Sequence, residues 1–185
     1  MSVKFLVGKY VYLRPLEKED IDLGYYKWIN DAEICKFNSH YRFPYSKEEL
    51  ENFINSSSKS KEKIVFAVIS NKGGQYAGNA SLQEINYINR SAEIASIIGI
   101  KGHEGLACTL DAYQLLIDHA FNNLNLNRVH GGTLSGHIVG QKIMELLNFT
   151  QEGTRRQAVY KNNQYYDIIE YGLLKEEWLR FRNKE

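Results

Sequence analysis

Three glycines, Gly99, Gly102 and Gly105, join an isoleucine-rich run to a stretch with helical spacing, and this arrangement could bind an anion. Residues 94–100 form a short apolar run of the kind found in buried strands. From Leu106 onward, apolar residues recur along one helical stripe. The first backbone N–H groups of a helix have no partner within it, and the helix dipole adds to their attraction for a phosphate. The segment therefore predicts a cofactor site at a helix N-terminus, where glycine would let a phosphate approach the backbone.

Other sites of phosphate or acyl chemistry are not indicated. The sequence has no GxxxxGK[ST] motif of a P-loop and no GxGxxG motif of a dinucleotide site. It has no nucleophile elbow, so a serine or cysteine hydrolase is not supported. A glycine turn that only joins a strand to a helix remains the alternative to a cofactor site.

Length and composition favour one globular domain. The chain has 185 residues, which is enough for one domain with a sizeable core and too few for two ordinary ones. Apolar residues make up 43% and charged residues 24%, so the chain is not predicted to be disordered. The net charge of +1 gives no basic field of the kind that attracts nucleic acid or a membrane surface.

The cysteines and the N-terminus bear on metal binding and location. Cys35 and Cys108 have no CxxC or zinc-ligand spacing, so we expect no metal site and two buried thiols in a reducing cytosol. The N-terminal segment has no long apolar core and no cleavage signal, and no run approaches membrane-spanning length. These features predict a soluble cytoplasmic protein with neither a membrane nor a nucleic-acid partner.

The elements that must position the glycine turn follow from periodicity and turn residues. The predicted strands are residues 9–13, 64–70, 76–85, 92–100, 127–134, 150–160 and 165–174. The predicted helices are residues 17–30, a helix opened by a Ser46–Glu49 capping box, and residues 106–121, 137–147 and 176–182. This order predicts a mixed α/β, α+β-like single domain, with a central, mostly antiparallel twisted sheet of about seven strands flanked by helices.

The element order, with a glycine turn after the fourth strand, resembles the GNAT superfamily of acyl-CoA-dependent N-acetyltransferases. The branch it resembles holds the ribosomal-protein N-terminal acetyltransferases and related small-molecule amine acetyltransferases. The resemblance runs over almost the whole chain, including YVYLRPLEKEDID, WINDAEI, AGNASLQEINYINRSAEIASIIGI, LLIDHAFNNLNLNRVHGGTL, MELLNFTQEG and YYDIIEYGLLKEEW. It implies a single GNAT-like domain over residues 1–185 and acetyl-CoA as cosubstrate, with its pyrophosphate on the glycine turn.

The resemblance also implies a set of cofactor contacts. The family turn is commonly Arg/Gln-x-x-Gly-x-Gly/Ala, and laid on residues 102–107 it keeps Gly105 and Ala107 but has Gly102 where Arg or Gln is expected. Lys101 or His103 could supply the missing group. The implied cofactor-binding residues are Ile98, Ile100, Gly102, His103, Glu104, Gly105, Leu106, Ala107 and His137.

Two further positions depart from the family pattern. His137 stands where the later helix normally begins with an Asn that reaches the cofactor. Met144 stands where many relatives have a tyrosine that protonates the leaving thiolate. These departures favour, as one alternative, a non-catalytic acyl-CoA-binding module.

The implied reaction needs a base and an oxyanion donor. An amine must be neutral to attack a thioester, and the oxyanion needs a donor, which the backbone around Ile98, Gly99 and Ile100 could provide. The predicted catalytic residues are Glu84, which follows the strand that lines the acceptor cleft in the family, and Ser96, which shares a face with Ile98. Further base candidates are Glu93, His103 and His137. A solvated Glu84 and a buried Ser96 that only satisfies the backbone are the alternatives.

We expect direct acetyl transfer to a primary amine of a small molecule, such as an amino sugar carried on a nucleotide. The near-neutral charge gives no reason to expect a ribosome-bound partner, and aromatic loops could stack on sugar or base rings. His40 lies in one such loop, and Arg155 with Arg156 could clamp a phosphate or form a solvated strand face. N-terminal acetylation of a protein such as a ribosomal protein remains the alternative. A homodimer is possible, because the closing strands could pair across chains.

Overall fold

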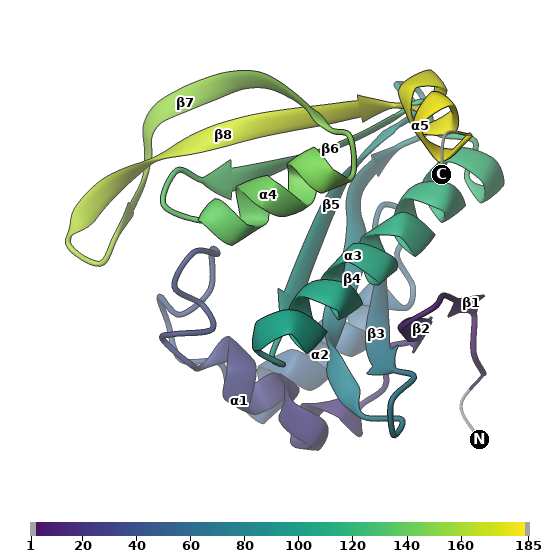
Figure 1. Cartoon of the computed structure of the whole chain (residues 1–185). Coiled ribbons are helices and arrows are strands. Elements are labelled where there is room, and N and C mark those ends of the chain that lie inside the picture. Colours follow the sequence, from purple (N-terminus) through teal and green to yellow (C-terminus); the bar gives the residue numbers. More distant parts are fainter. Residues whose placement is uncertain (1–2, 184–185) are drawn as a thin grey trace.

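The computed structural model describes residues 3–183, whose strands form one sheet in the order β1-β2-β3-β4-β5-β6-β8-β7 (Figure 1). The strands are β1 (Leu6–Val7), β2 (Val11–Pro15), β3 (Ile64–Ser70), β4 (Tyr76–Asn86), β5 (Ser91–Ile98), β6 (Arg128–Leu134), β7 (Thr150–Lys161) and β8 (Gln164–Leu174). Neighbouring strands pair antiparallel, except that β5 and β6 are parallel. The predicted mixed α/β, mostly antiparallel architecture is confirmed. The eighth strand is the two-residue β1, which is too short for periodicity to reveal.

The helices differ from the predictions mainly at their starts. They are α1 (Tyr26–Ile29), α2 (Lys47–Ser57), α3 (Gly102–Asp118), α4 (Ile138–Leu146) and α5 (Lys175–Arg182), with π-helical turns at Ile21–Tyr25 and His119–Asn123. The predicted start at residue 17 is wrong, because the Asp20 carboxylate accepts the Glu17 backbone N–H and pairs with Arg14 in a turn before the helix. The predicted start of α3 at Leu106 is also wrong. The glycines at 102 and 105 lie inside its first turn rather than before it.

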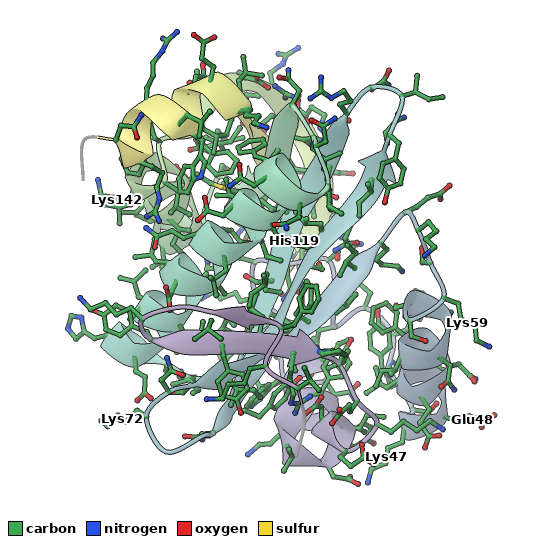
Figure 2. The ribbon with its side chains drawn as sticks, turned by 90° about the vertical axis from the view of Figure 1, so that its right-hand side faces the viewer. Lys47, Glu48, Lys59, Lys72, His119 and Lys142 are labelled. Carbon is green, nitrogen blue, oxygen red and sulfur yellow. The ribbon has the colours of Figure 1, made fainter. Side chains whose placement is uncertain are left out.

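Helices cover both faces of the sheet. Figure 2 shows α2 and α3 on opposite sides, with the charged side chains of Lys47 and Glu48 directed away from the sheet. One buried cluster joins α3, α4 and α5 to one face of the sheet, and the other joins α1 and α2 to the opposite face. Because side chains alternate along a strand, β5 supplies Ile94 to the first cluster and Ile97 to the second. β5 therefore runs through the middle of the molecule with both faces covered.

The parallel pair β5–β6 is held over only three residues. Ser91, Ala92 and Glu93 are in register with Arg128, Val129 and His130. Beyond them β5 continues to pair with β4 as far as Ile98, while β6 continues with β8 as far as Leu134. The two strands part, and the sheet opens in its centre.

Candidate active site

A central cavity of 380 Å³ lies where β5 and β6 part. Ile94 and Ser96 of β5 line it together with Thr133 of β6 and Tyr113 of α3. Ser96 Oγ donates a hydrogen bond to the Tyr113 hydroxyl at 3.2 Å, and burial raises the pKa of that phenol. The central cavity is therefore lined by a linked pair of hydroxyl groups. Tyr113 escaped the sequence reasoning because it lies on the apolar stripe of its helix.

A second cavity, the α3 cavity, has a volume of 540 Å³ and lies beside the N-terminus of α3. Seven of the nine predicted cofactor residues line it: Ile98, Ile100, Gly102, His103, Gly105, Leu106 and His137. Glu104 and Ala107 are not among its lining residues. Glu104 instead accepts a hydrogen bond from the Ser70 hydroxyl of β3 at 3.3 Å.

The first turn of α3 keeps its backbone donors accessible. Lys101 at the N-cap makes no side-chain capping hydrogen bond. Gly102 has φ of 73°, which favours glycine, and a Cβ there would meet nothing within 4 Å. Because His103 lines the α3 cavity and Lys101 does not, His103 is the better placed of the two to contact an anion. This arrangement fits the pyrophosphate of acetyl-CoA.

Gly105 lies where the start of α3 closely approaches the chain that follows β5. A Cβ at this position would lie 2.0 Å from the carbonyl oxygen of Ile100. The glycine is therefore needed for this close packing, and its contact with a phosphate stays a prediction. Close packing of the helix start on the strand end is what holds the donors of α3 beside the cavity.

The predicted oxyanion donors are only partly available. The Gly99 N–H donates to the Ala77 carbonyl of β4 at 2.9 Å, so the prediction that it serves an oxyanion is wrong. Ile98 and Ile100 line the α3 cavity. The backbone at these two positions remains the candidate.

The two candidate carboxylates occupy different places. Glu84 is exposed, has φ of 49° at an irregularity between β4 and β5, and is not among the residues lining the cavities described here. Glu93 is half-buried and lines the central cavity. Burial raises the pKa of Glu93, the charge of Glu84 raises it further, and Arg155 opposes both. The structure brings Glu93, and not Glu84, to the place where chemistry could occur.

His137 lies between the central and α3 cavities and lines both. Its ring stacks on Phe37 with centroids 5.1 Å apart, and its Nδ1 lies 3.5 Å from the Thr133 hydroxyl. Burial lowers the pKa of His137, which favours the neutral imidazole near pH 7. Met144, also in the central cavity, is buried and has no proton to give.

A third cavity, the α2 cavity, has a volume of 260 Å³ and lies on the other face of the sheet. Its walls come from Tyr25 and Ile29 beside α1, from Leu50 and Phe53 of α2, and from β4 and β5. The predicted loop residue His40 lines it, with its Nδ1 3.2 Å from the Tyr45 hydroxyl. Ser96 lines this cavity as well, so it is the residue that all three cavities share.

Of the two neighbouring arginines of β7, only one lines a cavity, as with the two glutamates. Arg155 lines the central cavity and forms an ion pair with Glu170 at 2.7 Å. Arg156 is exposed and lines none of the three cavities. Arg42, from the loop that follows α1, also lines the central cavity and has no ion-pair partner within residues 3–183.

Neither a metal site nor a membrane-spanning helix is found in residues 3–183. In the described part of the chain, no group of three or more His, Cys, Asp or Glu side chains could hold a metal ion. No helix between residues 3 and 183 has the length and apolar character needed to cross a membrane.

Residues 11–150 match the family described as the acetyltransferase (GNAT) domain, and this covers most of the chain. The chain therefore belongs to the GNAT acetyltransferase family, as the resemblance implied. In this member of the family, β5 and β6 part in the centre of the sheet, and the N-terminus of α3 lies beside the end of β5. This protein is an acetyl-CoA-dependent N-acetyltransferase.

Three relatives illustrate the match. YdaF of Bacillus subtilis, provisionally named a ribosomal N-acetyltransferase, is 36% identical over 105 residues, which span only 57% of each chain. Spermidine N(1)-acetyltransferase of Escherichia coli K12 is 27% identical over 91% of this chain and 88% of its own. The crystal structure of spermidine N-acetyltransferase from Vibrio cholerae, in complex with CoA and spermine, matches with a TM-score of 0.81 and 26% identity over 92% of this chain and 98% of that one.

Proposed function

We propose that this enzyme acetylates the primary amine of a small molecule by direct transfer from acetyl-CoA. The observation that supports it most is the position of Ser96, which lines the α3 cavity, the central cavity and the α2 cavity at once. A cosubstrate in the α3 cavity and an amine entering from the opposite face would meet there. The relatives named as acting on spermidine also support a small amine as acceptor.

The charges around the central cavity support an acceptor with an anionic part. Arg42 lines it without an ion-pair partner within residues 3–183, Arg155 lines it while paired with Glu170, and Glu93 is the one carboxylate among its lining residues. In the α2 cavity the carboxylate is Glu49, which already accepts the Ser46 backbone N–H at 2.7 Å. An amino sugar carried on a nucleotide has both the amine and the anion that this arrangement suits. A polyamine is the second candidate, favoured by the relatives, and a protein N-terminus is the third, favoured by the name of YdaF.

We assign the base to Glu93 rather than to Glu84. A carboxyl with a raised pKa at the cavity wall suits a group that must take a proton from an ammonium acceptor near neutral pH. The amine nitrogen then forms the new N–C bond as the C–S bond breaks. The Tyr113 hydroxyl, held by Ser96 in the cavity that Met144 also lines, is the candidate donor of the proton that the leaving thiolate needs.

A homodimer formed through the last two strands, β7 and β8, stays a prediction. β7 forms one edge of the sheet, and most of its side chains are exposed. Its outer edge could therefore pair with the same strand of a second chain.

A panel of amines with acetyl-CoA tests the proposed acceptor class. Thiol release would be measured with a nucleotide-linked amino sugar, with spermidine and with a peptide that has a free N-terminus. We expect the first to be favoured, with Arg42→Gln raising its KM about tenfold and leaving the KM of spermidine unchanged. Arg156→Gln is the matched control and should change neither value. Thiol release with the peptide alone would contradict a small-molecule acceptor, and release with spermidine alone would contradict an anionic one.

A further inference from the structure

A buried lysine at the end of β7 holds the loop that follows α1. Lys161 is 8% exposed, and its Nζ donates hydrogen bonds to three backbone carbonyl oxygens: that of Cys35 at 2.5 Å, and those of Asn38 and His40 at 2.8 Å each. These residues precede it by more than 120 positions. Figure 1 shows the free end of the β7–β8 hairpin extending to the side of the molecule where this loop lies.

The charge of this lysine has no ionic partner. Within residues 3–183 no carboxylate lies within ion-pairing distance of Lys161 Nζ. Burial lowers the pKa of Lys161, and the nearby charge of Arg42 lowers it further, whereas the Cys35 thiol raises it. A buried ammonium is costly unless it is fully hydrogen-bonded, and the three carbonyls accept all of its protons.

The loop of residues 31–45 has no helix or strand of its own. Its start is fixed by Asp31 Oδ1, which accepts the backbone N–H groups of Glu33 and Ile34. Its end is fixed by the Asn30 side chain, which exchanges hydrogen bonds with the backbone of Tyr45. Lys161 binds the middle of the loop, where the other backbone hydrogen bonds are local, such as that from the Asn38 N–H to the Cys35 carbonyl at 3.3 Å.

The same loop walls every cavity of the site. Arg42 lines the central cavity, His40 lines the α2 cavity, and Phe37 lines the central and α3 cavities while stacking on His137. The backbone carbonyls that Lys161 holds belong to this stretch. The loop also lines the α3 cavity, through Glu33, Ile34, Phe37 and Asn38, although most of that cavity comes from β5, α3 and α4. Arg42 and His40 line only the central and α2 cavities, so a shift of these two residues would change the acceptor side.

We infer that Lys161 is a positioning residue for acceptor binding: it holds residues 35–40 so that Arg42 and His40 face the amine substrate. The inference rests on the proposed function for its acceptor. The role belongs to the ammonium group, since three donors on one atom match three carbonyl acceptors. A neutral side chain of similar length would fill the space without holding the loop.

Lys161→Met tests this, with Lys161→Arg as the conservative variant and Lys175→Met as the matched control. Lys175 also donates from Nζ to a backbone carbonyl, that of Phe121 at 2.8 Å, but lines none of the three cavities. The measurements are the acceptor KM with the amine that turns over fastest, the kcat, the Kd of acetyl-CoA, and backbone hydrogen exchange over residues 31–45.

For Lys161→Met we expect the acceptor KM to rise about tenfold, with kcat and the acetyl-CoA Kd within about twofold of the parent. Exchange should speed up in residues 35–42 and stay unchanged in the sheet. Lys161→Arg, which keeps the charge and several donors, should recover part of the KM, and Lys175→Met should leave all four measurements unchanged.

Two results would overturn the inference. One is an acceptor KM and loop exchange that match the parent in Lys161→Met. The other is a loss shared equally by acetyl-CoA and acceptor with faster exchange across the sheet, which would make Lys161 a general support of the fold. If Lys161→Met does not fold, Lys161→Gln takes its place: a KM and loop exchange equal to the parent's decide against the role, and a raised KM with faster loop exchange decides for it. If no small amine turns over, the proposed function fails, while acetyl-CoA binding and loop exchange still test Lys161 separately.

Discussion

The two sides of this active site are built in different ways. On the cofactor side, the end of β5 and the starts of α3 and α4 supply most of the α3 cavity, the loop of residues 31–45 adds four residues, and the lining is mainly apolar. On the acceptor side, a loop without regular structure supplies Arg42 and His40, and its middle is held by Lys161 from the far end of the chain. One side depends on secondary structure, and the other on individual side chains.

This difference indicates which side of the active site tolerates changes in sequence. A helix start packed on a strand end binds an anion through groups that every residue possesses, so many sequences can form it. An acceptor site made from loop side chains changes with single substitutions, and the loop can change without disturbing the sheet. We expect substitutions on the cofactor side to damage binding of acetyl-CoA and stability together. On the acceptor side they should change turnover or acceptor KM alone.

Glu93→Gln should give the largest effect on turnover. If Glu93 takes the proton of the amine, removing its charge should lower kcat by about a hundredfold or more. The acetyl-CoA Kd should stay unchanged, because Glu93 lines the central cavity and not the α3 cavity. Steady-state kinetics and calorimetric titration measure the two quantities. A kcat close to the parent's would show that another group is the base.

Gly105→Ala should weaken both acetyl-CoA binding and the stability of the fold. Its Cβ would lie 2.0 Å from the Ile100 carbonyl oxygen, so α3 must move away from β5. We expect a loss of about 2 kcal/mol in the free energy of unfolding, together with weaker acetyl-CoA binding. Gly153→Ala is the control, because a Cβ there meets nothing within 4 Å. Denaturant unfolding and titration would be compared, and a stable variant with weak binding would instead favour the predicted phosphate contact at Gly105.

The sequence predicted most helices and strands because these follow from periodicity. The Ser46–Glu49 capping box depends on residues near in sequence, and it is present as predicted. The errors were local. Gly102 and Gly105 were predicted to lie in a turn before the helix, whereas α3 begins at Gly102 and Gly105 packs closely on the Ile100 carbonyl oxygen.

The acceptor side could not be predicted in the same way. Glu93 is in register with Gln83, and Glu84 lies in the irregularity that follows between β4 and β5, so Glu93 and not Glu84 lines the cavity. Lys161 and the loop it holds are more than 120 residues apart, and a lone lysine beside a turn gives no signal of burial. Ser96 could be placed by alternation along its strand, whereas its partner Tyr113 looked like an ordinary core residue.

Glu84→Gln should have the smallest effect, and it separates the two glutamates. The base must be deprotonated, so kcat/KM rises with pH through its pKa. The negative charge of Glu84 raises the pKa of Glu93, so its removal should lower that pKa and move the acid limb to lower pH. At pH values above this limb, kcat/KM should match the parent's. The control is Glu48→Gln, on the outer side of α2 (Figure 2), which should leave the limb at the parent's pH. If Glu84→Gln instead abolishes turnover at every pH, Glu84 is the base, and the exposed strand end rather than the central cavity is where the amine loses its proton.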